Sequence, residues 1–182
     1  MNKLLAGALI GAASLTFATT AMAVTGQTRA SYNAALDKAS ADYKMARDKC
    51  DALAGNGKDV CVEEAKAMEK RAKADAKANY KHTTKAQTSA LIAAADADYS
   101  VAKAKCGAKT GNEMSVCIEE AKAAQTKAVA QAKANKKVSD ARVEARDDTR
   151  EADYKVAAQK CDALTGVDKD SCVSAAKAKF NM

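Results

Sequence analysis

The chain has 182 residues and a formal net charge of +7, and 48% of its residues are apolar. Alanine dominates that apolar fraction, because aromatic residues make up only 4% of the chain and tryptophan is absent. Burial of apolar surface contributes about 25 cal/mol per Å², and alanine offers little surface to bury. The composition therefore excludes a large apolar core and favours a small fold held by covalent cross-links.

The N-terminus has the features of a secretory signal peptide. A positive start at Lys3 precedes an apolar segment of small residues over 4–20, and Ala-Met-Ala at 21–23 fits a small-x-small cleavage site. The segment lacks the large apolar residues of a membrane-spanning helix and the charge cluster that would retain it as an anchor. We expect cleavage after Ala23, which removes one lysine and no acid and lowers the net charge from +7 to +6. The mature protein, 24–182, is then periplasmic or secreted and has no transmembrane anchor.

All six cysteines belong to a motif that occurs three times. Each copy has two cysteines separated by ten residues, a glycine at one internal position, and a tyrosine seven residues before the first cysteine. The period of about 55 residues predicts a single helical repeat domain, with repeats at approximately 28–82, 83–138 and 139–182. The tyrosines are Tyr43, Tyr99 and Tyr154, and the cysteine pairs are Cys50 and Cys61, Cys106 and Cys117, and Cys161 and Cys172.

Helix formers fill the chain between these motifs. The chain has no proline, and after the signal its glycines gather almost wholly at the repeat loops. These features predict an all-α fold. In each loop the shared glycine (Gly55, Gly111 or Gly166) fits a helix C-cap. Four residues later an aligned Asp59, Ser115 or Asp170 fits the N-cap of the next helix, so each cysteine pair lies at a helix-turn-helix corner.

The lengths of the helices depend on two segments between the corners. Residues 81–84 and 138–140 contain capping residues, so each segment either interrupts a helix or is passed through. We favour continuous helices, the two longest about 70 Å each, in an elongated antiparallel arrangement. In this arrangement, corners one and three lie at one end of the molecule and corner two lies at the other. The alternative is three separate hairpins connected by flexible joints. The expected helices are 28–53, 59–105, 115–164 and 170–180.

We expect the cysteines to form structural disulfides within each motif. Six cysteines allow fifteen connectivities, and only pairing within each motif makes every repeat self-sufficient. Closing a loop of about a dozen residues stabilises the fold by about 3 kcal/mol in the chain-entropy model. A zinc site requires close cysteine or histidine pairs, and the only histidine is His82. Leu53 and Gly55 take positions where a calcium loop needs oxygen ligands, so we expect no metal and no cofactor.

Two groups of basic residues follow helical spacing. One interpretation is a solvated face with ion pairs to a neighbouring helix. The other is contact with anionic envelope polymers, lipid headgroups or acidic client proteins. Export, and the lack of aromatic side chains on which bases stack, argue against nucleic acid. The candidate anion contacts are a lysine stripe of Lys66, Lys70, Lys73, Lys77 and Lys81 and an arginine stripe of Arg142, Arg146 and Arg150.

The stretches KRAKADAKA at 70–78 and AKAAQTKAVAQAKA at 121–134 resemble the long Ala/Lys/Glu helix of TolA-like envelope proteins. That resemblance covers only the helical stretches and implies a periplasmic helical rod. The chain departs from TolA in its cleavable signal and its three cysteine corners. It also looks loosely like the small, basic, helical periplasmic chaperones of the Spy type, without their Leu-Thr-x-x-Gln motif.

Together these features predict a non-enzymatic structural or interaction protein of the cell envelope, with basic faces that contact an anionic envelope component or an envelope protein. A periplasmic holdase chaperone is the alternative. The sequence contains no recognisable nucleophile–base pair and no glycine-rich phosphate loop, so we do not expect an enzyme. Long helices with alanine faces leave self-association open.

Overall fold

Residues 28–182 are described in a computed structural model, and they form five α-helices and one short 3-10 helix without any strand. The predicted all-α class is confirmed. The predicted signal peptide lies outside these residues. In chain order the elements are α1 (Arg29–Lys49), η1 (Cys50–Ala52), α2 (Gly55–Lys81), α3 (Thr84–Cys106), α4 (Gly111–Cys161) and α5 (Gly166–Phe180).

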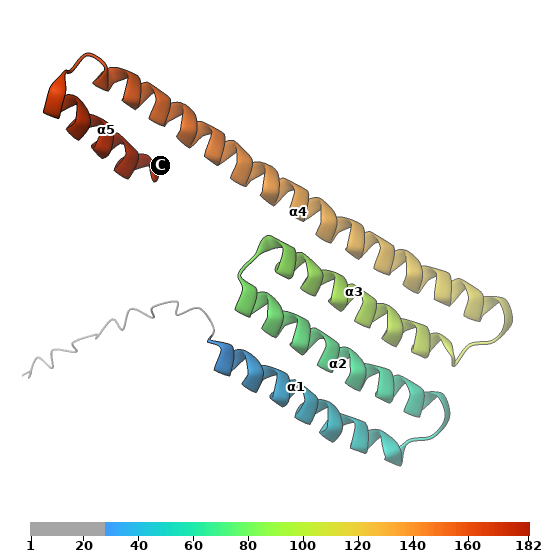
Figure 1. The fold of residues 1–182 in the computed structure, drawn as a ribbon. Coiled ribbons are helices and arrows are strands. Elements are labelled where there is room, and N and C mark those ends of the chain that lie inside the picture. Colours follow the sequence, from blue (N-terminus) through green and yellow to red (C-terminus); the bar gives the residue numbers. More distant parts are fainter. Residues whose placement is uncertain (1–27) are drawn as a thin grey trace, which may run out of the picture.

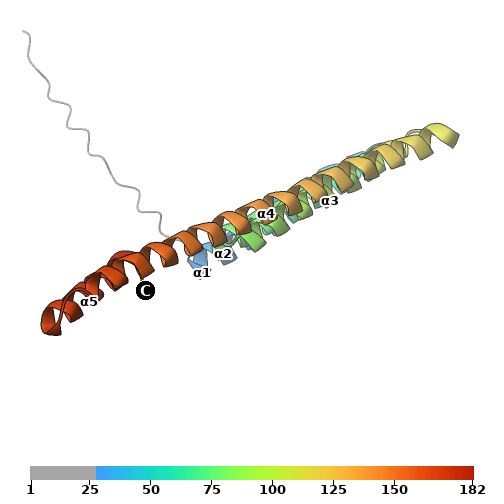
Figure 2. The same cartoon turned by 90° about the horizontal axis from the view of Figure 1, so that it is seen from above.

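The helices lie side by side in a single layer. Each α-helix contacts only the helices that precede and follow it, so α1 touches α2 but not α3, and α5 touches only α4. Figure 1 shows α1, α2 and α3 as antiparallel neighbours against the first half of α4, and α5 folded back on its far end. Seen from above in Figure 2, the layer is one helix thick. Both broad faces of the protein are therefore open to solvent.

The core consists of narrow seams between neighbouring helices. The buried apolar residues are eleven alanines and the first cysteine of each corner, and Thr88 is the one buried polar residue within 28–182. Alanine has no side chain beyond Cβ, so it lets two helix backbones approach closely. The alanine-rich composition is thus used in seams rather than in a central core. The buried alanines are Ala39, Ala65, Ala67, Ala76, Ala78, Ala90, Ala95, Ala97, Ala121, Ala132 and Ala176.

The predicted capping pattern at the corners is wrong. Gly55, Gly111 and Gly166 do not cap the preceding helices; each begins the next helix, with φ of +56°, +55° and +57°. The predicted N-caps Asp59, Ser115 and Asp170 consequently lie inside helices, and the true N-caps are extended residues without a side-chain cap. The physical reason is that the preceding helices end early, near the first cysteine. The left-handed glycine turns the chain into the next helix instead of closing the previous one.

Only one of the two segments that can interrupt a helix does so. α2 ends at Lys81, His82 takes a left-handed conformation with φ of 48°, and the hydroxyl of Thr83 accepts a hydrogen bond from the Ala86 amide at 3.1 Å. The continuous helix predicted over 59–105 is therefore wrong. By contrast, α4 runs through 138–140 over 51 residues, or about 76 Å, as predicted.

The break at His82 changes the arrangement of the corners. Because α2 and α3 form their own hairpin, corners one and two lie at the same end of the layer and corner three lies at the far end (Figure 1). The expectation that corners one and three share an end is wrong. The expected repeat boundary near 138 falls inside α4, so the second and third cysteine corners share one helix.

Candidate functional site

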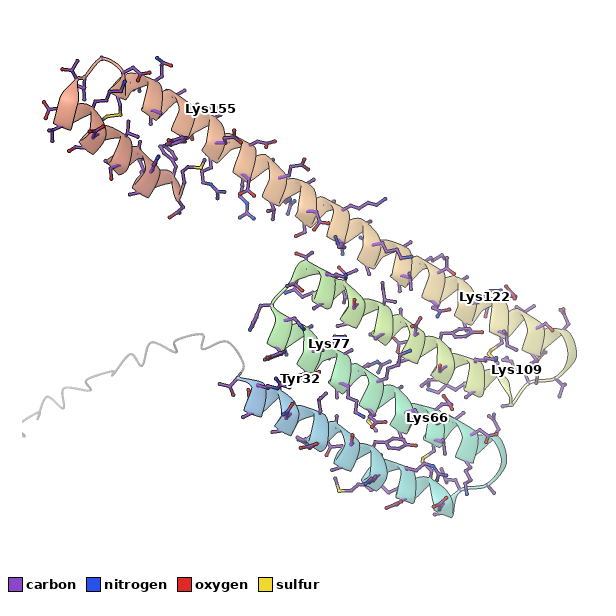
Figure 3. The ribbon with its side chains drawn as sticks, viewed as in Figure 1. Tyr32, Lys66, Lys77, Lys109, Lys122 and Lys155 are labelled. Carbon is purple, nitrogen blue, oxygen red and sulfur yellow. A yellow bond between two sulfur atoms is a disulfide. The ribbon has the colours of Figure 1, made fainter. Side chains whose placement is uncertain are left out.

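The three predicted disulfides are present. Cys50–Cys61, Cys106–Cys117 and Cys161–Cys172 have Cα–Cα distances of 5.6, 5.7 and 5.7 Å. In each pair the first cysteine is buried and the second is half-buried (Figure 3 draws the bonds in yellow). Disulfides persist in oxidising compartments, so the three bonds indicate an extracytoplasmic location.

Corners one and three carry the same shallow groove. One groove lies between α1 and α2 and the other between α4 and α5, and each runs beside its disulfide. Most lining residues are repeat equivalents: an acid, an exposed apolar residue, an alanine and a lysine from the first helix, then a cysteine and an alanine from the second. The equivalent pairs are Asp42 and Asp153, Met45 and Val156, Ala46 and Ala157, Lys49 and Lys160, Cys61 and Cys172, and Ala65 and Ala176.

The sequence contains a signal for this groove beyond the cysteine spacing. The phrase Ala-Asp-Tyr-x-(Met or Val)-Ala-x-x-Lys-Cys ends at Cys50, Cys106 and Cys161 alike. Its conserved spacing within the chain places the acid, the apolar residue and the lysine on the groove wall of α1 and α4. Comparison of the three copies finds these residues. Their common surface is recognisable only once the helices are paired.

An ion pair closes the loops of corners one and three. Lys58 lies 3.0 Å from Asp51, and Lys169 lies 2.8 Å from the equivalent Asp162. The hydrogen bond from Lys58, followed by that from Arg47, lowers the pKa of Asp51, and the bond to Asp162 raises the pKa of Lys169. Each pair links the end of one helix to the start of the next at an exposed position.

Corner two lacks both residues of this ion pair, because Met114 stands where the other corners have the lysine. Gly107 stands where the other corners have the aspartate. The Asn56 side chain reaches across from α2 and donates a hydrogen bond to the Ala104 carbonyl at 2.7 Å. A Cβ atom on Gly107 would lie 2.5 Å from the Asn56 amide nitrogen, so a side chain there would displace Asn56. Packing between the hairpins thus explains the glycine at position 107.

Most of the lysine stripe on α2 is paired with acids. Lys66 lies 2.7 Å from Glu63, Lys70 lies 3.4 Å from Asp96 on α3, and Lys73 lies 2.6 Å from Glu69. The hydrogen bond to Glu63 raises the pKa of Lys66. Lys77 and Lys81 are exposed and have no acid within 4.0 Å among residues 28–182. Figure 3 labels Lys66 near corner one and Lys77 toward the opposite end of α2.

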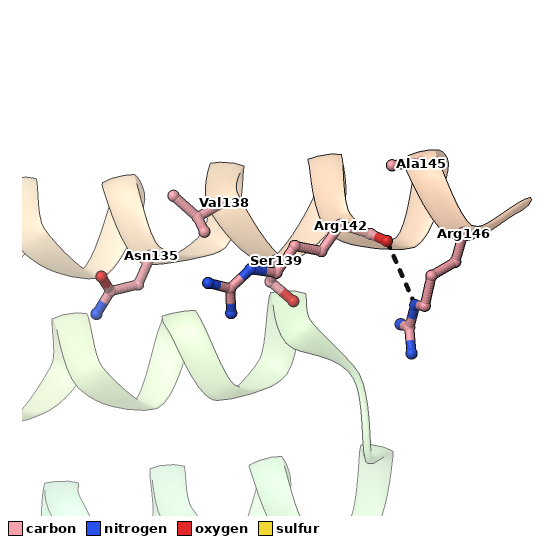
Figure 4. A pocket seen from close by; sticks show the side chains of 6 residues that line it. All are labelled: Asn135, Val138, Ser139, Arg142, Ala145 and Arg146. Atoms are coloured by element: carbon pink, nitrogen blue, oxygen red, sulfur yellow. Dashed lines mark hydrogen bonds between the residues drawn. The ribbon is translucent and has the colours of Figure 1, made fainter. Parts of the chain in front are cut away.

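The arginine stripe lies on the part of α4 that has no other helix packed beside it. All ten residues from 141 to 150 are exposed, because α3 begins and α5 ends on either side of this stretch (Figure 1). Arg150 pairs with Asp147 at 2.9 Å, and the Arg146 side chain donates to the Arg142 carbonyl at 3.3 Å. Figure 4 shows Arg142 and Arg146 on the side of α4 toward the N-terminus of α3, in a hollow that Asn135, Val138, Ser139 and Ala145 also line.

Five of the cations that have no acid within 4.0 Å among residues 28–182 lie at one end of the three-helix layer. Lys77 and Lys81 end α2, Lys85 begins α3, and Arg142 and Arg146 lie where α4 passes that end. Sequence reasoning missed Lys85, which is exposed at the turn after His82. We call these five residues the cationic end.

No helix within the described part of the chain is long and apolar enough to cross a membrane. Comparisons with protein families, with curated proteins and with solved structures give no match for this chain.

Proposed function

We propose that this chain is an exported, non-enzymatic interaction protein of the cell envelope: a stapled helical scaffold that contacts anionic envelope components through its cationic end. The observation that carries the proposal is the single layer of helices cross-linked at every corner. Such a layer offers two broad faces where α1, α2 and α3 lie against the first half of α4, and it encloses little interior volume. That form suits contact with extended partners.

The ion pairs reduce the number of predicted anion contacts, because cations that already pair with an acid are weaker candidates. Lys66, Lys70, Lys73 and Arg150 already have acids within 4.0 Å, so their charge is partly compensated. The cations of the cationic end have no such acids among residues 28–182, and their field extends into solvent over about a Debye length, roughly 8 Å at physiological salt. We therefore assign anionic partners to Lys77, Lys81, Arg142 and Arg146 rather than to the whole of both stripes.

A matched pair of variants tests this assignment. One variant changes Lys77, Lys81, Arg142 and Arg146 to alanine, and its control changes the paired Lys66, Lys70, Lys73 and Arg150, so both lose four positive charges. The measurement is binding to vesicles with and without anionic phospholipid, and to soluble anionic envelope polysaccharide, at low and high salt. At about 1 kcal/mol per cation, the first variant should lose affinity by about a thousandfold, and the control far less. Equal losses, or binding that does not respond to salt, would contradict the proposal.

Exposed methionines support a holdase chaperone as the second candidate. Met45 and Met68 line the groove of corner one with 57% and 52% of their surfaces exposed. Methionine is flexible and adapts to varied apolar partners. A holdase would suppress aggregation of an unfolded client at near-stoichiometric ratios, and Met45→Ser with Met68→Ser should abolish that suppression. A wild-type protein that leaves client aggregation unchanged would remove this candidate.

A further inference from the structure

One long side of α4 is covered by no other helix. The buried residues of α4, Ala121, Ala132 and Cys161, lie on the side that packs against α3 and α5. At 3.6 residues per turn, the opposite side forms a nearly straight row of exposed residues. We call this row the outer edge; Figure 1 shows that it borders the layer. It consists of Val116, Ala123, Lys127, Ala130, Ala134, Ala141, Ala145, Asp148 and Ala152.

The outer edge has the chemistry of the seams inside the layer, except at two positions. Alanines dominate it, as they dominate the packed sides of α2 and α3, but alanine alone does not identify a partner. The exceptions are Lys127 and Asp148, which carry opposite charges. Neither has an opposite charge within 4.0 Å in the described part of the chain, whereas eight other charged residues of α4 form ion pairs within the helix.

We propose that the outer edge binds a second copy of this chain in antiparallel orientation, about a two-fold axis between Lys137 and Val138. In that register, residues equally far from the axis lie at the same level. Lys127 then meets the partner's Asp148, and Asp148 meets the partner's Lys127. The alanines coincide as well: Ala134 faces the partner's Ala141, Ala130 the partner's Ala145, and Ala123 the partner's Ala152. A two-fold interface requires this self-complementarity.

Residues on either side of the outer edge also meet suitable counterparts in this register. Glu119 lies nearly level with the partner's Lys155, again twice, and the half-exposed Val138 meets the partner's Val138 at the axis. Lys137 faces the partner's Lys137 and is the one like-charged pair. Against one repulsive contact stand two contacts between the unpaired Lys127 and Asp148 and two weaker ones, because Glu119 and Lys155 already pair with Lys122 and Glu151. This interface does not depend on the proposed anion binding, because none of the cationic-end residues belongs to the outer edge.

A charge-reversal series tests the interface by sedimentation equilibrium of the purified, oxidised protein. We expect the wild type to form a dimer. Lys127→Glu should raise the dissociation constant about tenfold, because it replaces attraction by repulsion in two contacts of each dimer. The double variant Lys127→Glu, Asp148→Lys should restore the wild-type value, and Lys137→Gln should tighten the dimer. Lys133→Glu is the control, since Lys133 is exposed on α4 but points to a broad face.

Three results would overturn the proposal. One is a wild-type protein that stays monomeric at every accessible concentration. Another is a Lys133→Glu variant weakened as much as Lys127→Glu, or a double variant that is not restored, with unchanged helicity by circular dichroism. The third is a series of larger oligomers, which would indicate that α4 pairs with the open side of α1 in the next copy and so builds an extended layer.

Discussion

Asn56 joins the first two corners through a single side chain. Its amide donates to the Ala104 carbonyl at 2.7 Å, near the end of α3, where that carbonyl also accepts from the Gly107 amide at 3.0 Å. We predict that Asn56→Ala lowers the free energy of unfolding by about 1 kcal/mol, because a partly buried hydrogen bond is lost. Urea denaturation measures this change. Asn112 is the repeat equivalent and is exposed without such a bond, so Asn112→Ala should have little effect.

A substitution at Gly107 gives an independent test of the hydrogen bond between Asn56 and Ala104. Gly107→Ala should destabilise the wild type, because the new Cβ displaces the Asn56 side chain. The same substitution should cost less in the Asn56→Ala background, where the hydrogen bond is already absent. Additive effects of the two substitutions would show that Asn56 and Gly107 are not coupled.

Asp51 makes the stability of corner one sensitive to acid. Its pKa is lowered from 3.8, first by the hydrogen bond from Lys58 and then by that from Arg47. A carboxyl whose pKa is lower in the folded protein stabilises the fold above its unfolded pKa, and this contribution disappears as the pH falls through the folded value. We predict that Asp51→Asn lowers the thermal midpoint slightly at pH 7. The difference from wild type should shrink as the pH falls below 3.8 and vanish only below the lowered pKa of the folded protein. A difference that persists in acid would rule out the charge as its cause.

At the scale of helices, the two segments with capping residues differ in backbone conformation. His82 is left-handed and exposed, and a non-glycine residue there is strained, whereas Ser139 is helical within α4. We predict that His82→Gly raises the free energy of unfolding by about 0.5–1 kcal/mol, because glycine adopts this conformation without strain. The same change in α4, Ser139→Gly, should lower it by about 0.5 kcal/mol. Chemical denaturation distinguishes the two; destabilisation by both would contradict the left-handed turn.

The sequence predicts the features that depend on residues close together in the chain, but not those that depend on how the helices pack. The disulfide pairs were predictable because each cysteine pair is separated by ten residues and repeats three times. The helix ends were not, because a glycine with positive φ can close one helix or open the next, and the choice depends on where the cysteine cross-link ends the first. The break at His82 was ambiguous because the capping residues of 81–84 occur both at helix ends and within helices. The corner grooves and the cationic end required knowledge of which helices pair.

At the scale of the whole molecule, each helix depends on its immediate neighbours alone. Layers of this kind behave as nearest-neighbour arrays, in which stability is the sum of local units and their shared seams. α2 and α3 have a neighbouring helix on both sides, whereas α1 packs on α2 alone and α5 on α4 alone; of these two terminal helices α5 is the shorter, with 15 residues against 21. Tyr154 and Phe180, with ring centroids 6.4 Å apart, and the buried Ala176 form most of that terminal seam. The third disulfide therefore contributes a larger share of its hairpin's stability than the other two.

Removal of the third disulfide tests this nearest-neighbour view. A helix of 15 residues is marginal on its own, and the cross-link supplies about 3 kcal/mol of constraint. In the Cys161→Ser, Cys172→Ser variant, we predict that the amides of α5 lose hydrogen-exchange protection while those of α2 and α3 keep theirs. The Cys106→Ser, Cys117→Ser control should leave α3 helical, because α2 still packs against its other side. Cooperative loss of protection throughout the chain in the first variant would instead show that the layer unfolds as one unit, with coupling that extends beyond adjacent helices.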